Sequence, residues 1–300
     1  MTDHSPLRSA WTDSLARGEQ PDAAALRSHL HAIHTDHAGF TETCAQACRD
    51  TAGRTSYEWL AEVVAHRPRG RILDLACGSG VLLEILHAQN TQLSLTGVDM
   101  CPQELSLAAA RLPEGAADLV RAEAQDLAEL VDASVDTVLC HWALTLMDPI
   151  EPVLREVRRV LKPGGTFAAV VDGPMHAAPG YTEVHSLIYG HVQAEVPGYG
   201  EIDLGDPRVR GSDSLSDLVR RVFEDATVTV EPEVVVMRGP AAAVAESVAG
   251  FFYAAFTLSA MRRSRMLTEL AMLLAAPGST VTKDTEVTFS MPINRLVVSR

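Results

Sequence analysis

Carboxylates and glycines come together where two apolar segments of this sequence end. The segment that contains Asp74 runs into a turn of small residues with Gly78 and Gly80, and a second segment, 93–99, ends in Asp99. Glycine lets a ligand approach the main chain closely, and the first N–H groups of a following helix are free to bind polar groups. An acid about 20 residues after such a turn occupies the place where doubly wound sheets hold ribose hydroxyls. These residues therefore predict a site for a small polar ligand.

Alternating strands and helices are expected to position these residues. Short apolar runs that end in polar residues are typical of buried parallel strands. Pro163 and the glycines after it forbid continuation of a helix, so the helix before them should end at the Lys-Pro-Gly-Gly turn. Strands are predicted over 71–75, 93–99, 119–126, 134–141, 166–172 and 226–237, with further β-rich segments at 286–291 and 295–299, and helices over 81–88, 149–161 and 241–275.

This succession resembles the class I S-adenosylmethionine-dependent methyltransferases. The segments LDLACGSG, GVDMCPQELSLAAAR, AEAQDL, SVDTVLCHWALTLMDP and LREVRRVLKPGGTF follow that family's motifs in order and spacing over residues 70–172. The resemblance is greatest to the small-molecule branch, which includes quinone-biosynthesis and natural-product enzymes. It implies an α/β fold: a doubly wound, Rossmann-like seven-stranded sheet with helices on both faces, an antiparallel last strand, and helical N-terminal and lid additions.

A dinucleotide dehydrogenase is the main rival for a strand, glycine turn and helix. Such an enzyme prefers a third glycine in its G-x-G-x-x-G motif, and Leu83 stands at that position here. Dehydrogenases also lack the LKPGG turn. The methyltransferase resemblance is therefore the favoured interpretation.

The resemblance assigns cofactor-binding roles to the residues that match the motifs. Asp74 would orient the methionine end of S-adenosylmethionine, Asp99 would bind the ribose, and Met100 would pack against adenine. Gly78 and Gly80 match the glycines that approach the cofactor. The first glycine of the usual pattern is replaced by Ala76. We expect the turn to tolerate this alanine less well than a glycine, without loss of cofactor binding.

The remaining cofactor residues follow the third and fourth strands or precede the fold. Glu123 and Ala124 stand where the family has Asp-Ala at the adenine, although Gln125 or Asp126 could supply the contact instead. Cys140 and His141 end the fourth strand, whose tip faces the reactive methyl group in the family. Thr55 and Glu58 form a capping box at the start of a helix, beside which Arg54 and Tyr57 could reach the cofactor carboxylate.

Histidine has the right pKa range for a general base, which is needed only if the acceptor must lose a proton. The candidates, in order, are His141, His176 and His185. His141 has two other interpretations, a wall residue of the site or a packed ring.

The chain is expected to divide into a helical N-terminal cap (1–68), a cofactor-binding core (69–172) and a remainder of the same catalytic domain (173–300). Substrate-cap insertions are predicted over 173–215 and 240–275. Between Pro163 and Pro207 the chain has six acids and no Lys or Arg. This stretch predicts either a solvated acidic loop or a pocket for an amine, a guanidine or another cationic acceptor.

Composition limits the class of partner. The net charge is −14 and no segment is a basic platform, which disfavours nucleic acid. The cysteines lack paired metal spacing and are expected to be reduced, and His29, His31, His34 and His37 are expected on an exposed helix with no metal. The apolar stretch 241–261 is interpreted as a buried helix rather than a membrane span, because it carries polar residues. We expect a cytoplasmic monomer or homodimer.

The predicted function is in-line methyl transfer from S-adenosylmethionine to a small-molecule acceptor, at O, N or C. Two alternatives remain open at this point. One is an enzyme of the same fold that uses the bound cofactor for cyclisation or decarboxylation, and the other is a non-catalytic relative that binds the cofactor.

Overall fold

The apolar segments join in one seven-stranded sheet of order β3-β2-β1-β4-β5-β7-β6 in the computed structural model, which describes residues 6–276 and 286–300. Strands β1 to β5 are parallel to one another, and β7 is antiparallel to β5. This is the predicted doubly wound, Rossmann-like sheet with an antiparallel last strand. The strands are β1 (Gly70–Leu75), β2 (Leu93–Asp99), β3 (Asp118–Arg121), β4 (Val135–His141), β5 (Leu161–Asp172), β6 (Thr227–Gly239) and β7 (Val287–Ser299).

The chain divides into two compact units that each draw on separated stretches of sequence. Unit 1 comprises Met1–Thr51, Met175–Asp203 and Val234–Pro292, and unit 2 comprises Ala52–Pro174, Leu204–Glu233 and Ile293–Arg300. Strands β1 to β5, and with them every residue matched to the family motifs, belong to unit 2.

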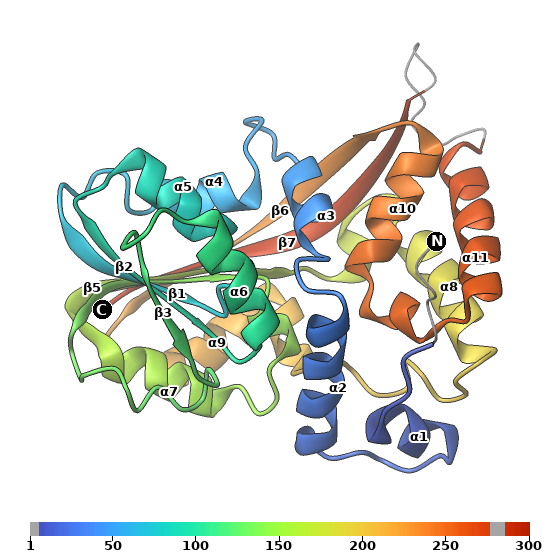
Figure 1. Cartoon of the computed structure of the whole chain (residues 1–300), viewed down its shortest axis with the longest axis horizontal. Helices are drawn as coiled ribbons and strands as arrows, with labels where there is room; N and C mark the ends of the chain where they lie inside the picture. Colours follow the sequence, from blue (N-terminus) through green and yellow to red (C-terminus); the bar gives the residue numbers. More distant parts are fainter. Residues whose placement is uncertain (1–5, 277–285) are drawn as a thin grey trace. The chain divides into compact units, whose positions relative to one another are not determined.

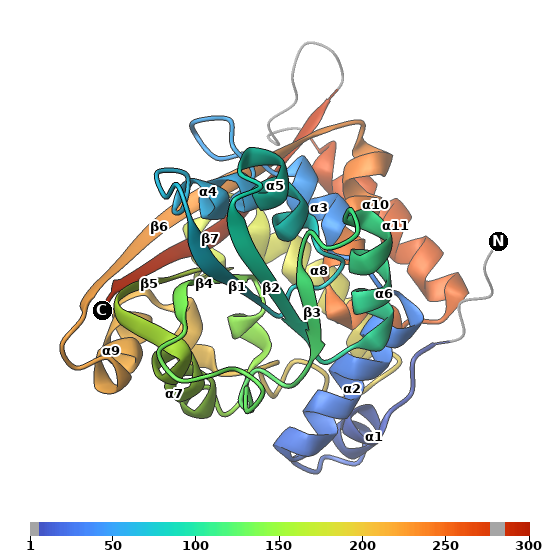
Figure 2. The same ribbon diagram turned by 60° about the vertical axis from the view of Figure 1, so that its left-hand side comes forward.

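Helices cover both faces of the parallel strands in unit 2. Helices α4, α5 and α6 lie on one side, and α7 and α9 lie on the other (Figures 1 and 2). The helical elements of unit 2 are α4 (Ser56–Glu62), α5 (Val81–Gln89), α6 (Pro102–Arg111), η1 (Leu144–Leu146), α7 (Glu151–Val160), η3 (Pro207–Arg210) and α9 (Ser212–Val222).

The core of unit 2 follows from residue spacing. Helix α7 buries one apolar stripe at positions 153, 154, 157 and 160, as the 3.6-residue period requires. In the same core cluster, the rings of Phe167 and Phe223 stack with centroids 6.3 Å apart, and both are buried. Each such side chain contributes about 1.5–3 kcal/mol through removal of its apolar surface from water.

The order of strands creates the crevice in which a ligand can bind. Strand β1 pairs with β2 on one side and β4 on the other. The connections that leave β1 and β4 therefore run to opposite faces, which opens a crevice at their carboxyl ends. The loops after β1, β2 and β4 lie along this same edge of the sheet.

The Lys-Pro-Gly-Gly segment differs from the predicted turn. Helix α7 does end before it, but β5 already begins at Leu161, which pairs with Val135. The next pair is Thr137 with Thr166, so between these pairs a single residue of β4 lies opposite four residues of β5, which form a bulge. Gly164 has φ 75°, a left-handed conformation that suits glycine in such a bulge.

Unit 1 is mainly helical. Its described elements, apart from its parts of β6 and β7, are α1 (Ala10–Ala16), α2 (Ala23–Asp36), α3 (Glu42–Ala47), η2 (Met175–Ala177), α8 (Tyr181–Gln193), α10 (Ala241–Phe251), η4 (Tyr253–Thr257) and α11 (Ala260–Leu274). The stretch 241–261 thus forms α10, η4 and the start of α11. None of the helices in residues 6–276 and 286–300 has the length and hydropathy that crossing a membrane requires.

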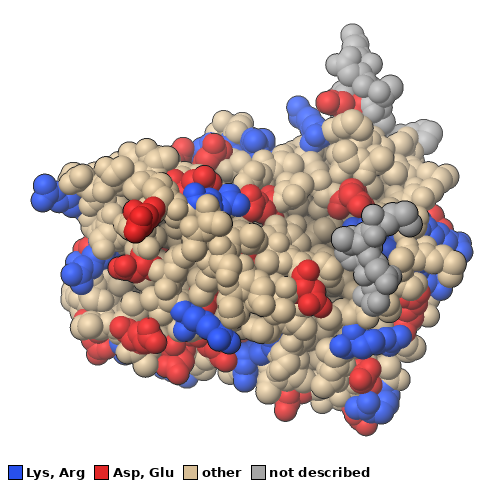
Figure 3. Space-filling model, viewed as in Figure 1, with Lys and Arg blue, Asp and Glu red and all other residues tan. Residues whose placement is uncertain are grey.

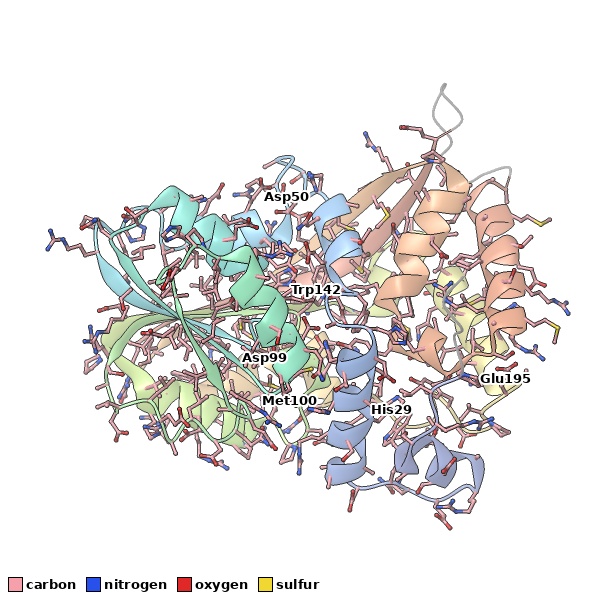
Figure 4. The ribbon with its side chains drawn as sticks, viewed as in Figure 1. His29, Asp50, Asp99, Met100, Trp142 and Glu195 are labelled. Carbon is pink, nitrogen blue, oxygen red and sulfur yellow. The ribbon has the colours of Figure 1, made fainter. Side chains whose placement is uncertain are left out.

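His29 departs from its predicted exposure. It lies on α2 (Figure 4) and is fully buried, with its ring stacked on Trp11 at 5.0 Å and its Nδ1 2.9 Å from the Ser9 hydroxyl. Burial lowers the pKa of His29 to about 4. The reason lies in spacing, because Leu26, Leu30 and Ile33 place His29 on the apolar stripe of the helix.

Candidate functional site

The turn after β1 depends on left-handed backbone conformations. Gly78 and Gly80 have φ 51° and 80°, and Ala76 has φ 57°. A Cβ on Gly80 would lie 2.8 Å from the Cβ of Ala108, so only glycine fits there. Ala76 keeps the turn in the conformation that glycine adopts more easily, at a cost of about 1–2 kcal/mol for an L-residue.

Asp99 holds this turn in place. Its carboxylate accepts hydrogen bonds from the backbone N–H of Gly78 at 2.9 Å and of Cys101 at 2.8 Å. Asp99 is the last residue of β2 and Met100 follows it, at the carboxyl edge of the sheet (Figure 4). The acid predicted to bind ribose therefore also ties the second strand to the glycine turn.

Asp74 is a buried carboxylate with unmet hydrogen-bonding capacity. It is 1% exposed, and neither carboxylate oxygen has a hydrogen-bond partner among the described residues. Burial and the charge of Asp99 raise the pKa of Asp74 well above its ordinary value. A carboxylate left this way is costly to the apo protein and is satisfied by a ligand that brings positive charge or N–H donors.

An imidazole, a hydroxyl and a phenol ring meet at the end of β4. His141 Nε2 lies 2.7 Å from the Ser56 hydroxyl oxygen, and the ring of Tyr57 stacks on His141 with centroids 3.7 Å apart. Burial lowers the pKa of His141 to about 3. The capping box of Thr55 with Glu58, predicted from the sequence, starts the helix that carries Ser56 and Tyr57.

Trp142 and Asp172 extend this group, and the sequence motifs had assigned no role to Trp142. Trp142 has φ 58° and its ring meets His141 edge-on at 5.0 Å. Burial raises the pKa of Asp172 at the end of β5, against the opposing effects of Arg210 and of the Trp142 indole. The signal in the sequence was an aromatic residue directly after a strand that ends in polar groups.

The remaining cofactor candidates occupy separate positions in unit 2. Cys140 is buried, and its surroundings together with the Asp74 charge raise its pKa to about 12. Gln125 donates to the Glu123 carboxylate in the loop after β3. Ala124 in the same loop packs against the apolar core. Arg54 forms an ion pair of 2.5 Å with Glu62.

The three histidines considered as general bases are divided between the units. His141 belongs to unit 2, whereas His176 and His185 belong to unit 1. His176 is exposed in η2, and His185 on α8 stacks on Tyr189 at 3.9 Å. The structure therefore does not place these three histidines in one compact unit.

Two acids of the basic-free stretch are engaged within the protein. Glu195 accepts hydrogen bonds from Ser259 and Arg262, and Asp206 pairs with Arg208 at 2.5 Å. By contrast, Glu183 and Glu201 are exposed. The stretch is thus a mixture of structural and solvated carboxylates.

Charged side chains are interspersed on the face drawn in Figure 3, where Lys and Arg lie among Asp and Glu. Within residues 6–276 and 286–300, no group of three or more His, Cys, Asp and Glu residues has the geometry of a metal site. The five cysteines are free and buried.

Comparisons with known proteins agree with this fold. Residues 73–169 match the family model described as a methyltransferase domain. The chain is 36% identical over 135 residues to the demethylmenaquinone methyltransferase of Deinococcus radiodurans, covering 44% of this chain and 54% of that protein. It is 34% identical over 99 residues to the ubiquinone biosynthesis O-methyltransferase of Pseudomonas aeruginosa, covering 32% of this chain and 41% of that protein.

Among solved structures, the YcgJ protein of Bacillus subtilis is similar, with a TM-score of 0.55, 16% identity and coverage of 82% of this chain and 97% of that one. At this identity the likeness shows the fold alone. The chain spans about half the length of the first of the curated relatives that it matches.

Proposed function

We propose that this chain, which carries a class I methyltransferase domain matched over residues 73–169, is an S-adenosylmethionine-dependent methyltransferase that acts on a small-molecule acceptor. The observation that carries the proposal is Asp74, a buried carboxylate without a hydrogen-bond partner beside a glycine turn. A ligand with a cationic end and a ribose fits this turn, because Asp74 lacks a partner and Asp99 stands at the next strand end.

In this proposal, different residues of unit 2 bind different parts of the cofactor. Asp74 holds the methionine end, and the turn with Gly78 and Gly80 admits the cofactor close to the main chain. Asp99 binds the ribose, and Met100 packs against the adenine. Glu123, Ala124 and Gln125 contact the adenine edge. Arg54 and Tyr57 bind the cofactor carboxylate, and Cys140 forms part of the wall.

When bound, S-adenosylmethionine supplies both the methyl group and its own leaving group. The protein then has to align the acceptor with the methyl group and exclude water. The stacked rings of Tyr57 and His141, with Trp142 edge-on, provide a rigid aromatic surface for this. With a pKa of about 3, His141 is neutral and a weak proton acceptor, so we assign it to the wall of the site.

Two acceptor classes follow from different observations. The relatives named above act on quinone precursors, and a flat ring of that kind suits an aromatic surface. The exposed acids Glu183 and Glu201 instead favour an amine or guanidine, whose affinity would fall when these acids are neutralised. We also propose that the predicted cap segments 173–215 and 240–275 select the acceptor, with His176 and His185 as candidate bases.

A labelled-methyl assay tests the proposal. The protein is incubated with S-adenosylmethionine and a panel of hydroxynaphthoquinones, phenols, amines and guanidines, and S-adenosylhomocysteine and methylated product are quantified by mass spectrometry. We expect stoichiometric S-adenosylhomocysteine with one class, and its loss in Asp99→Asn but not in Asp118→Asn, an exposed acid on β3.

Two results would contradict the proposal. Converted acceptor without S-adenosylhomocysteine would indicate chemistry other than methylation. If calorimetry detected no binding of S-adenosylmethionine, the protein would not be a methyltransferase that uses this cofactor.

A further inference from the structure

The hydroxyl of Ser56 has a partner to which no sequence motif points. Ser56 is the first residue of α4 and is 1% exposed, and its Oγ lies 2.7 Å from Nε2 of His141 at the end of β4. Within residues 6–276 and 286–300, the structure gives neither side chain another hydrogen bond. Because buried hydroxyls are normally hydrogen-bonded, this contact determines how the imidazole is held.

The direction of that hydrogen bond decides which nitrogen of His141 carries the proton. If Nε2–H donated to Ser56, the buried hydroxyl hydrogen would have no acceptor among the described residues. If Ser56 O–H donates to Nε2, the unmet donor is Nδ1–H, on a ring that is only half-buried. An unmet donor costs most where it is fully buried, so the second arrangement is favoured and the proton of His141 is on Nδ1.

Neighbouring rings restrict the orientation of this imidazole. The ring of Tyr57 stacks on it with centroids 3.7 Å apart and planes at 19°, and Trp142 meets it edge-on at 5.0 Å. Nδ1 is not among the fully buried polar atoms that lack a partner in the described part of the chain. It is therefore the ring nitrogen that a ligand can reach. Burial lowers the pKa of His141 to about 3, so the ring is neutral.

The register of the sheet places His141 beside the unpartnered carboxylate of Asp74. Asp74 on β1 pairs with Leu139 on β4. Side chains alternate along a strand, so His141 lies on the same face of the sheet as Leu139 and Asp74, about 7 Å further towards the carboxyl edge. A ligand held at Asp74 by its cationic end thus extends towards the Nδ1–H of His141.

We propose that Ser56 positions His141 as a neutral hydrogen-bond donor whose Nδ1–H binds an oxygen atom of the methyl acceptor. This inference rests on the proposed function and chooses between the two acceptor classes given there. The oxygen of a phenol, a phenolate or a quinone carbonyl has lone pairs for this donor, whereas a protonated amine or a guanidinium offers only N–H groups. A neutral imidazole of this kind polarises an oxygen without transferring a proton.

Ser56 is a positioning residue in this account, because it acts on the acceptor through His141. Long-range proton–nitrogen NMR correlation of isotopically labelled histidines reads the tautomer without cofactor or acceptor, and His141→Gln identifies the signal. We expect the proton on Nδ1 in wild type and in Ser56→Thr, which keeps the hydroxyl, and mainly on Nε2, as in free histidine, in Ser56→Ala. Ser212→Ala is the control, since Ser212 is likewise the first residue of its helix, α9, and should leave the signal unchanged.

A wild-type proton on Nε2, or a tautomer that Ser56→Ala leaves unchanged, would overturn the inference. The wild-type measurement needs no variant of Ser56, so it decides the question even if Ser56→Ala does not fold. A purely structural role of Ser56 would change stability without moving the proton of His141.

Kinetics with the phenols and hydroxynaphthoquinones of the methyl-transfer panel test the contact with the acceptor. Loss of one hydrogen bond in Ser56→Ala should raise the acceptor KM about tenfold, with recovery in Ser56→Thr, and change the dissociation constant of S-adenosylmethionine less than about twofold. Weaker cofactor binding with an unchanged acceptor KM would overturn the inference, as would methylation of amines or guanidines alone. Failure of wild-type protein to bind S-adenosylmethionine would instead count against the proposed function, and the tautomer of His141 would still be measurable.

Discussion

Burial changes the protonation behaviour of two side chains at the carboxyl edge of the sheet. Asp74 has a raised pKa without a hydrogen-bond partner, and His141 has a pKa lowered to about 3. Both shifts disfavour a charge that the folded protein does not compensate. Each shift has a consequence that is measurable without an acceptor.

Asp74→Asn should stabilise the apo protein at neutral pH by about 1–3 kcal/mol, because it removes an uncompensated buried charge. The folded state of the wild type binds the proton of Asp74 more tightly than the unfolded state, whose pKa is about 3.9. The contribution of Asp74 to the free energy of unfolding is therefore complete below about pH 4, and it is lost as pH rises through the raised pKa of the folded state. Urea unfolding at pH 5 and pH 8 checks this, with Asp118→Asn as the control.

A pH dependence that Asp74→Asn leaves unchanged would contradict that assignment. The same substitution should weaken S-adenosylmethionine binding, since the amide has no negative charge. Lower affinity with higher stability is the trade expected of a residue kept for function.

The His141 imidazole should stay neutral from pH 5 to pH 8. Its Hε1 resonance, identified by comparison with His141→Gln, should not shift over that range in the apo protein. Free histidine in the same buffer serves as the reference for an imidazole that gains its proton in this range. Titration of His141 near pH 6.5 would restore it as a candidate general base.

At the scale of secondary-structure elements, the close approach of Gly80 to Ala108 determines how the glycine turn packs against helix α6. Gly80→Ala should cost about 2–4 kcal/mol, through its left-handed backbone and through the 2.8 Å approach of the new Cβ to Ala108. Gly115→Ala is the matched control, because Gly115 has φ 74° with open space around it. Gly115→Ala should lower the free energy of unfolding only by the cost of a left-handed backbone conformation, about 1–2 kcal/mol.

The difference between the two free energies of unfolding, from denaturant titration, isolates the steric contact. Equal costs would mean that α6 moves aside without penalty. Binding of S-adenosylmethionine should also weaken in Gly80→Ala and not in Gly115→Ala.

The N-cap residue of helix α11 is held by a carboxylate from a distant segment of the chain. Glu195 accepts hydrogen bonds from the Ser259 N–H at 2.8 Å and its hydroxyl at 2.6 Å. Glu195→Ala should destabilise the protein by about 1–2 kcal/mol in urea unfolding, and Glu183→Ala, an exposed acid on α8, should not. Burial raises the pKa of Glu195, but the bonds from Ser259 and Arg262 outweigh it and the net shift is downward.

This contribution is therefore complete above the unfolded pKa of about 4.3 and is lost as pH falls through the lower folded pKa. A Glu195→Ala effect that persisted unchanged at pH 3 would contradict the role of the carboxylate.

Sequence patterns predicted the elements that follow local rules. The strand that carries Asp74, the helix that begins at Val81 and the cap at Thr55 all depend on short-range spacing. The bulge at Gly164 could not be predicted, because it arises from the register with β4. The burial of His29 had a visible signal in its neighbours Leu26 and Ile33, but the four histidines were assigned together to an exposed helix.

The same distinction applies to the candidate site. Asp99 stood at the end of a predicted strand, so its position beside the glycine turn followed from sheet topology. Ser56 and Trp142 gave no motif, and their surroundings depend on how α4 and β4 pack against each other.

At the scale of the whole molecule, the division into two units predicts where a bound cofactor stabilises the protein. S-adenosylmethionine at 100 times its dissociation constant adds about 2.7 kcal/mol to the state that binds it. Hydrogen exchange should slow at the Gly78 and Cys101 amides of unit 2 and stay unchanged in α8 and α11 of unit 1. ATP at the same concentration is the control.

Equal slowing throughout the described residues would mean that the two units open together. Confinement of the effect to unit 1 would contradict the location of the cofactor. Either result would be visible in the same exchange experiment.

The place of β7 in the sheet has a consequence for biosynthesis. β7 lies between β5 and β6, although it is made after both, and its Ser299 pairs with Thr166. Until that strand has emerged from the ribosome, β5 keeps an open edge that other chains can join, which is a hazard for nascent proteins. A sheet whose inner strand is made after both of its neighbours depends on how fast that strand docks, or on a chaperone, more than its final stability would suggest.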